Sequence, residues 1–209
     1  MSDQKKSGPF RFLSLGLAVL AAGIGIYWFQ SAERKAATPV VAISAPGSVS
    51  RELATGALAA FLVKPERKPL PDAAFQDGTG KPLKVSNWKG RVMLINLWAT
   101  WCAPCRKEMP TLAALQAKLG SADFEVVAIS VDRKGVEASS AFLKDTGADA
   151  LKLYVEPTTT ILNEFQALGL PATLLVDRQG NEIGRLLGPA DWASPEAIAL
   201  INAALAESR

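Results

Sequence analysis

The sequence predicts an α/β domain with a central mixed β-sheet flanked by helices, preceded by a separate apolar segment near the N-terminus. Beyond Leu70, strand-like and helix-like runs alternate along the chain. Two of the strand-like runs, 91–98 and 124–131, are almost continuously apolar, as expected of central strands covered on both faces. With 209 residues, 49% of them hydrophobic, the chain is long enough for one such domain and an extension.

The apolar segment, residues 12–30, is predicted to be a transmembrane anchor. It contains about 18 consecutive uncharged residues, close to the minimum for a helix that spans a bilayer. Basic residues dominate the preceding tail, residues 1–11, so the positive-inside rule places this tail in the cytoplasm. The sequence therefore predicts a single-pass protein of the inner membrane with its catalytic domain in the periplasm. A cleavable signal peptide is the alternative, although 31–35 shows no clear cleavage site.

Residues 31–70 are interpreted as a linker because they are rich in alanine, serine and mixed charge, and prolines interrupt them repeatedly. Within the linker, residues 51–63 (RELATGALAAFLV) are compatible with a short amphipathic helix that packs on the domain or on the membrane surface. The domain itself is predicted to occupy residues 71–209.

The elements of the domain follow from local patterns. The turn 76–81 (QDGTGK) joins two short extended runs and indicates a β-hairpin. Residues 103–119 carry apolar side chains on one face at helical spacing. The pattern then predicts, in order, a strand at 124–131, a helix at 136–146, a strand at 151–155, a helix at 159–168, a hairpin of 173–177 with 182–187, and a helix at 195–206 with Ser194 as its N-cap.

Composition narrows the possible chemistry to a redox dithiol. The chain has no histidine, the commonest metal ligand and general base, and only two cysteines, Cys102 and Cys105. A structural zinc site needs four ligands, and a c-type haem site needs histidine where this chain has Arg106. No metal or cofactor is therefore expected beyond the redox-active disulfide. The net charge of +3 offers no basic surface for nucleic acid.

The motif Trp-Cys-Ala-Pro-Cys follows a predicted central strand and opens a predicted helix. Unpaired N–H groups and the helix dipole stabilise a thiolate there, which makes Cys102 the predicted nucleophile. Cys105, one turn further, would resolve the mixed disulfide, and Pro104 fits the first helical turn. A purely structural disulfide is the alternative, but a bridge that closes so short a loop adds little stability.

Three segments carry a family resemblance: NLWATWCAPCRKEMP (96–110), GLPATLLVD (169–177) and GPADWAS (188–194). Together they resemble the TlpA branch of the thioredoxin superfamily, related to ResA and CcmG. The resemblance covers about residues 70 to 206 and implies a thioredoxin-like fold. It also implies that Pro171 is a cis-proline facing the dithiol, with the backbone of Leu170 available to hydrogen-bond a bound peptide.

Further site residues follow from the same resemblance. Thioredoxins carry a buried aspartate where this chain has Asn96, and an amide cannot accept the proton of the resolving thiol. Glu108, one helical turn beyond Cys105, is then the carboxylate nearest in sequence, and ResA-like proteins have a glutamate at the matching place. It is either the proton carrier or a solvated helix charge. Trp98 is expected to pack behind the dithiol, and Trp101 to form part of an apolar docking rim.

The resemblance implies a reductant of selected extracytoplasmic proteins, either copper-site proteins of cytochrome oxidase or apocytochrome c. Its electron source would be a membrane dithiol carrier related to CcdA or DsbD. A general periplasmic oxidant or isomerase is the alternative, since reduction potential and not fold separates the two. The alternatives outside enzymes are a membrane-anchored docking module and a copper chaperone of the Sco type, although the chain lacks the cysteine spacing and the histidine of the latter.

Overall fold

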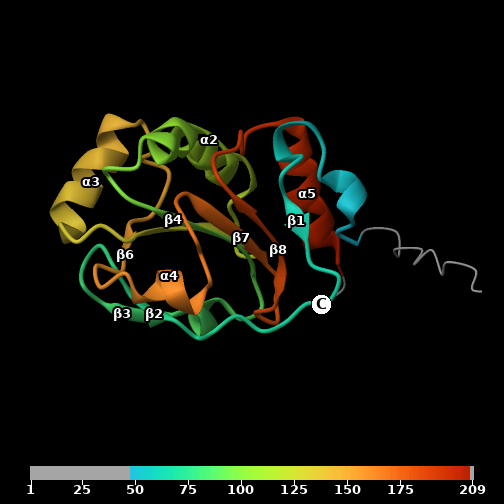
Figure 1. Cartoon of the computed structure of the whole chain (residues 1–209), viewed down its shortest axis with the longest axis horizontal. Helices are drawn as coiled ribbons and strands as arrows, with labels where there is room; N and C mark the ends of the chain where they lie inside the picture. The colour runs from blue at the N-terminus through green and yellow to red at the C-terminus, as the bar shows by residue number, and fades with distance from the viewer. Residues whose placement is uncertain (1–47, 208–209) are drawn as a thin grey trace, which may run out of the picture. The chain divides into compact units, whose positions relative to one another are not determined.

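The structure, a computed structural model, describes residues 48–207. In this part of the chain a mixed eight-stranded sheet carries helices on both faces, with strand order β1-β8-β7-β4-β5-β6-β2-β3 (Figure 1). The strands are β1 (Leu62–Val63), β2 (Ala74–Asp77), β3 (Pro82–Lys84), β4 (Val92–Trp98), β5 (Phe124–Ser130), β6 (Tyr154–Val155), β7 (Ala172–Val176) and β8 (Glu182–Leu187). The α-helices are α2 (Ala103–Leu119), α3 (Gly135–Asp145), α4 (Thr160–Glu164) and α5 (Pro195–Ala206), and 3-10 turns are η2 (Arg51–Leu53), η3 (Gly56–Leu58) and η4 (Val85–Trp88).

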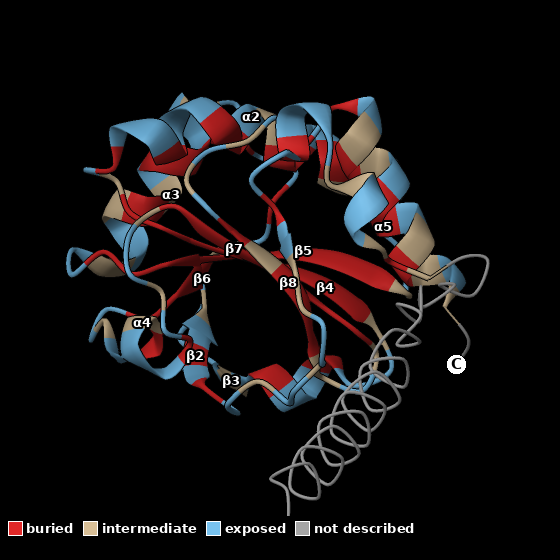
Figure 2. Ribbon diagram, turned by 45° about the vertical axis from the view of Figure 1, so that its right-hand side comes forward, coloured by how far each residue is buried: buried red, intermediate tan, exposed pale blue. Residues whose placement is uncertain are grey.

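The centre of the sheet is formed by β4, β5 and β7. β5 runs parallel to β4, whereas β7 pairs antiparallel with β4 on the other side. Every residue of these three strands is buried, and they form the red centre of Figure 2. Because apolar side chains project from both faces, helices must cover both faces. This confirms that the runs 91–98 and 124–131 are central strands.

The helices form two layers around this sheet. α2, α3 and α5 lie on one side of the sheet and α4 on the other, as both views show (Figures 1 and 2). α5 begins as predicted, because the Ser194 hydroxyl oxygen accepts a hydrogen bond from the N–H of Ala197 at 3.2 Å. The hairpin around 76–81 and the hairpin of β7 with β8 are also confirmed.

The helix predicted over 51–63 is wrong. The chain there forms η2, η3 and then β1, which pairs antiparallel with β8. Gly56 adopts a φ of +52°, in the left-handed region, so a right-handed helix cannot run through it. Leu58 and Phe61 are buried in the core instead. Residues 48–70, here called the strap, therefore pack on the domain, although their composition had suggested a linker.

Two elements are shorter than predicted. β6 covers two residues of the predicted strand 151–155, and α4 covers five residues of the predicted helix 159–168. α4 ends early because Gln166 has a φ of +53°, and the N–H groups of Gln166 and Ala167 bond back to Asn163 and Leu162. This is a Schellman motif, which closes a helix through one left-handed residue.

The predicted transmembrane segment 12–30 and tail 1–11 lie outside the described residues. Within residues 48–207, no helix has the length and apolar character needed to cross a bilayer.

Candidate active site

The two cysteines lie where the central strand β4 passes into α2. The N–H of Cys102 bonds to the carbonyl of Ala99 at 3.1 Å, which closes a tight turn after β4. Cys102 is the N-cap of α2, and Pro104 occupies its first turn. The two sulfurs form a disulfide. Cys105 is fully buried, and only 4% of Cys102 is exposed.

The start of α2 favours negative charge on the first sulfur. The Sγ of Cys102 accepts a hydrogen bond from the N–H of Cys105 at 3.2 Å, one of the N–H groups that have no partner within a helix. After reduction, the same N–H and the positive end of the helix dipole stabilise a thiolate at Cys102. Arg106 is not dedicated to stabilising this thiolate, because its guanidinium pairs with Asp145 at 2.6 Å and lies over the Phe142 ring.

Glu108 lies one turn beyond Cys105 on α2 and is buried, with 1% of its surface exposed. Three donors converge on its carboxylate: Asn96 Nδ2 at 2.8 Å, Trp192 Nε1 at 3.2 Å and the N–H of Ala190 at 3.3 Å. Burial raises the pKa of Glu108 to about 7, although the hydrogen bonds from these donors act to lower it. The interpretation of Glu108 as a solvated helix charge is therefore wrong.

Asn96 lies in the middle of β4 with no exposed surface and links the sheet to α2. Its Nδ2 donates to Glu108 and also to the Thr173 hydroxyl on β7 at 2.9 Å. The structure thus joins Asn96 and Glu108, which the sequence suggested only separately. It adds Thr173 and Trp192, which sequence reasoning did not assign, although both lie in the segments 169–177 and 188–194 that carried the resemblance.

The surroundings of the disulfide divide into a buried and an exposed part. Trp98 is fully buried and stacks on Phe142 at 4.9 Å between ring centroids, as expected of a residue on the core side. Trp101 is 70% exposed, which fits a docking rim. The Leu170–Pro171 peptide bond is cis, as the resemblance implied, and Leu170 is half-buried.

Two further large apolar side chains are exposed in the elements next to the cis-proline. Leu168, three residues before Pro171, is 92% exposed, and Leu187 on β8 is 44% exposed. Leu187 pairs with Ala172, directly after Pro171. The only sequence signal for Leu168 was its place in the segment that leads to Pro171.

The arrangement suits thiol–disulfide exchange. A shielded cysteine pair at a helix start can cycle between dithiol and disulfide, and a buried carboxylate with a pKa near 7 can exchange a proton near neutral pH. Among residues 48–207, no group of three or more histidine, cysteine, aspartate or glutamate side chains is placed to hold a metal ion.

Comparison with known proteins agrees with this geometry. The sequence pattern of the AhpC/TSA family matches residues 67–181. The thiol-disulfide oxidoreductase ResA of Bacillus cereus is 27% identical over 121 residues, which are 58% of this chain and 69% of ResA. ResA of Bacillus subtilis is 28% identical over 118 residues, which are 56% of this chain and 65% of that protein.

A solved structure supports the same assignment. The crystal structure described as a thiol:disulfide interchange protein DsbE from Chlorobium tepidum is 30% identical, with a TM-score of 0.60. The match covers 67% of this chain and 97% of that one. The resemblance to the TlpA, ResA and CcmG branch is thereby confirmed. The chain belongs to the AhpC/TSA family, as a thioredoxin-like thiol:disulfide oxidoreductase of the ResA and DsbE type.

Proposed function

We propose that the protein is a membrane-anchored reductant of selected disulfides outside the cytoplasm. In each cycle the Cys102 thiolate attacks one sulfur of a partner disulfide, forms a mixed disulfide and expels the partner's other sulfur as a thiolate. Cys105 loses its proton and attacks Cys102, which releases the second partner sulfur. The partner gains two electrons and two protons, and the Cys102–Cys105 disulfide forms.

The observation that carries the exchange chemistry of this proposal is the buried pair of Cys105 and Glu108 on successive turns of α2. Residues three apart on a helix lie on the same face, with Cβ atoms roughly 5–6 Å apart. A resolving thiol of ordinary pKa near 8.5 is mostly protonated at neutral pH and needs a base. Glu108, with a pKa of about 7, is ionised often enough to accept that proton and release it again.

Partner docking is proposed to involve Trp101, Leu170 and Pro171. Trp101 offers exposed apolar surface next to Cys102. The Leu170 backbone lies just before the start of β7, where an extended partner segment is proposed to hydrogen-bond to it. Main-chain pairing of this kind accepts many sequences, so the apolar rim would supply most of the selectivity.

The partners proposed from the TlpA resemblance are copper-site assembly proteins of cytochrome oxidase or apocytochrome c. Reduction outside the cytoplasm has to be driven, so a membrane dithiol carrier of the CcdA or DsbD type is the proposed electron donor. Residues 12–30 are proposed to anchor the chain in the inner membrane, with residues 1–11 in the cytoplasm. When the full chain is expressed, recovery of a protein cleaved after the apolar segment in the soluble periplasmic fraction would contradict the anchor.

The decisive experiment is the equilibrium reduction potential of the Cys102–Cys105 disulfide in the purified full chain, titrated with glutathione or dithiothreitol. A reductant is expected to lie near the thioredoxin value of about −270 mV. A general oxidant, the alternative function, would lie near the DsbA value of about −120 mV. A reduction potential near the DsbA value would rule out the proposed flow of electrons from this protein to its partners.

A further inference from the structure

The loop that leads to the cis-proline is held at both ends by β8. This loop, residues 165–171, joins α4 to β7 and contains the exposed Leu168 and the half-buried Leu170. At its end, the carbonyl of Pro171 accepts a hydrogen bond from the N–H of Gly188 at 2.9 Å. At its beginning, the Arg185 side chain donates from β8 to the backbone of the loop.

Arg185 is fixed by bonds to two partners at once. Its Nη1 donates to the carbonyl of Phe165 at 2.8 Å and to that of Gln166 at 3.4 Å. Its Nε and Nη2 form a bidentate pair with the Glu182 carboxylate at 2.5 and 2.6 Å. Both side chains are largely buried, with 12% and 9% of their surface exposed. A planar guanidinium held by a fork of this kind has little freedom to move.

Arg185 binds the backbone at the C-terminal end of α4. α4 closes through Gln166 at a φ of +53°, a conformation that costs a residue other than glycine roughly 1–2 kcal/mol. The last carbonyls of a helix also have no partner within it and carry the negative end of the dipole. The Arg185 cation binds one of these carbonyls, that of the C-cap residue Phe165, and also the carbonyl of Gln166, the left-handed residue from which the loop departs.

We propose that Arg185 is a positioning residue for partner docking. Through the Phe165 and Gln166 carbonyls it fixes the start of the loop, and so sets where Leu168 and the Leu170 backbone meet a partner polypeptide. Its own hydrogen bonds go to Glu182 and to the loop backbone, so it acts on docking and not on the sulfur chemistry. The inference rests on the proposed docking of a partner at Leu170.

The test compares a macromolecular disulfide with a small one. Arg185→Met keeps the length of the side chain but removes every donor. With insulin as the probe, the KM for reduction is expected to rise about tenfold with kcat little changed. The reaction of the reduced protein with 5,5′-dithiobis(2-nitrobenzoate), which needs no docking loop, is expected to keep its rate. Arg185→Lys keeps the positive charge but cannot form the bidentate pair, and it is expected to raise the KM for insulin less than Arg185→Met does.

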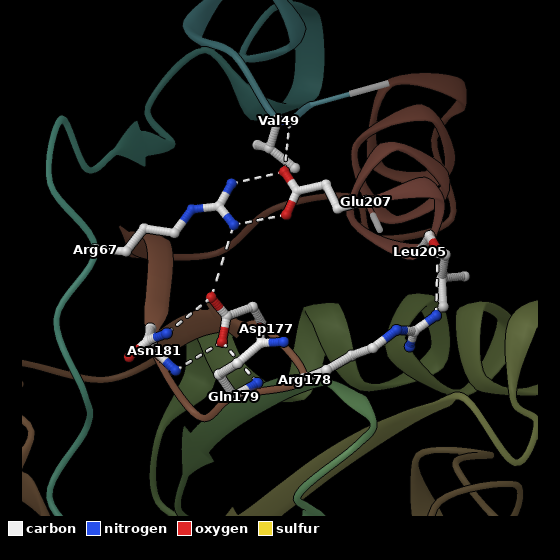
Figure 3. Close-up of polar contacts among 8 residues, drawn as sticks. All are labelled: Val49, Arg67, Asp177, Arg178, Gln179, Asn181, Leu205 and Glu207. Atoms are coloured by element: carbon white, nitrogen blue, oxygen red, sulfur yellow. Dashed lines mark hydrogen bonds and ion pairs between the residues drawn. The ribbon is translucent and has the colours of Figure 1, made fainter. Parts of the chain in front are cut away.

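Arg67→Met is the matched control, because Arg67 also forms a bidentate pair, with Glu207 at 2.6 Å for both bonds (Figure 3). Its hydrogen bonds and ion pairs go to Glu207 and Asp177 and not to the loop. It is expected to lower stability without raising the KM for insulin. If Arg185→Met also leaves that KM unchanged, or slows both probes equally, the inference fails. If Arg185→Met does not fold, amide exchange at residues 166–170 is measured in Arg185→Lys and in Arg67→Met instead. Faster exchange in Arg185→Lys but not in Arg67→Met would support the inference, and unchanged exchange in Arg185→Lys would reject it.

A separate variant distinguishes this inference from the docking proposal on which it rests. Trp101→Ser alters the proposed rim directly. If Trp101→Ser raises the KM for insulin and Arg185→Met does not, the rim stands and only the role of Arg185 is rejected. If neither variant changes the KM, the docking surface itself is rejected.

Discussion

At the scale of single residues, burial and hydrogen bonding act in opposite directions on the pKa of Glu108. The protonated form is favoured because the carboxyl group is removed from water. The ionised form is favoured because Asn96, Ala190 and Trp192 all donate to its oxygens. The resulting pKa of about 7 lies where small changes in pH change the charge of the group.

Glu108→Gln is expected to slow disulfide exchange and to change its pH dependence. A base must be ionised, so turnover in the natural protein should rise with pH through about 7. Glutamine cannot accept the Cys105 proton, so this rise of turnover with pH should disappear. Turnover at pH 7 should fall by about 100-fold, the lower end of the usual contribution of general acid–base catalysis. The measurement is kcat for insulin reduction between pH 5 and pH 9.

Glu125→Gln is a suitable control for this variant. Glu125 is also buried, but it lies on β5 and is bound by Tyr154, Arg91 and Lys152. Its replacement should lower stability, while turnover should still rise with pH through about 7. A pH profile of Glu108→Gln that still rises through pH 7 would remove Glu108 from the proton path.

Residue-level predictions succeeded where the signal was local. The position of Cys102 at the helix start followed from the CxxC motif, and the cis bond of Pro171 followed from the family resemblance that three short segments carry. The burial of Glu108 could not be predicted from helical spacing, because it depends on Trp192, 84 positions along the chain. The role of Arg185 is equally hidden, since only the fold brings it to the end of α4.

Among the elements, the pairing of β1 with β8 depends on one glycine. A Cβ atom added at Gly184 would lie 2.5 Å from Phe61 Cε1 and 2.6 Å from the carbonyl oxygen of Leu62. The Leu62 oxygen belongs to the backbone, so rotation of a side chain cannot relieve that contact. The absence of a side chain at Gly184 therefore allows the strap to lie close against the sheet.

Gly184→Ala is expected to displace β1 and lower the free energy of unfolding by about 1–3 kcal/mol, the usual cost of overpacking a core. Urea unfolding measures the loss, and limited proteolysis should show earlier cleavage within the strap. Gly169→Ala is the control, because nothing lies within 4 Å of a Cβ atom there. Equal urea midpoints for the natural protein and Gly184→Ala would show that the close packing of β1 contributes little.

The elements that the sequence predicted well have strong local patterns. α2 and α5 have N-caps and apolar faces, and β4 and β5 are continuous apolar runs. Residues 51–63 and α4 were predicted less well, because a left-handed residue interrupts each of them. At 51–63 the interruption is Gly56, where an added Cβ atom would lie 2.3 Å from Glu196 Oε1 on α5. Such a long-range contact leaves no trace in local periodicity.

For the whole molecule, the main unexpected feature is that the two ends of the described chain are tied together. The Glu207 carboxylate, directly after α5, accepts hydrogen bonds from the Val49 N–H and from both terminal nitrogens of Arg67 (Figure 3). Arg67 also pairs with Asp177 at 3.7 Å. Proline content suggested a linker here, because composition does not reveal which distant partners a segment meets.

This cluster lies away from the redox site. α5 begins just after Trp192, whose indole binds Glu108, and it ends at Ala206. A helix of 12 residues is about 18 Å long. The Arg67–Glu207 cluster therefore lies at the end of α5 far from the disulfide, and a change in this cluster should affect stability without affecting exchange chemistry.

Glu207→Gln tests this separation through the pH dependence of stability. Burial acts to raise the pKa of Glu207, but the hydrogen bonds and charge of Arg67, with the Val49 N–H, outweigh it and hold that pKa below its ordinary value of 4.5. A carboxylate with a lowered pKa stabilises the fold above its unfolded pKa, and the contribution disappears as the pH falls through its folded pKa. The variant should therefore be less stable at pH 7 by roughly 1–2 kcal/mol.

The difference between Glu207→Gln and the natural protein should stay constant from pH 7 down to about 5 and shrink as the pH falls below about 4.5. The natural carboxyl group is then protonated first in the unfolded state and, at its lower folded pKa, in the folded state as well. Urea unfolding of both oxidised proteins at pH 7, 5 and 3 measures this difference. A difference that does not shrink between pH 5 and pH 3 would assign the loss to altered packing around Val49, since a charge contribution must decrease over that range. A slower reaction of the reduced variant with 5,5′-dithiobis(2-nitrobenzoate) would instead show that the strap and the redox site are coupled along α5.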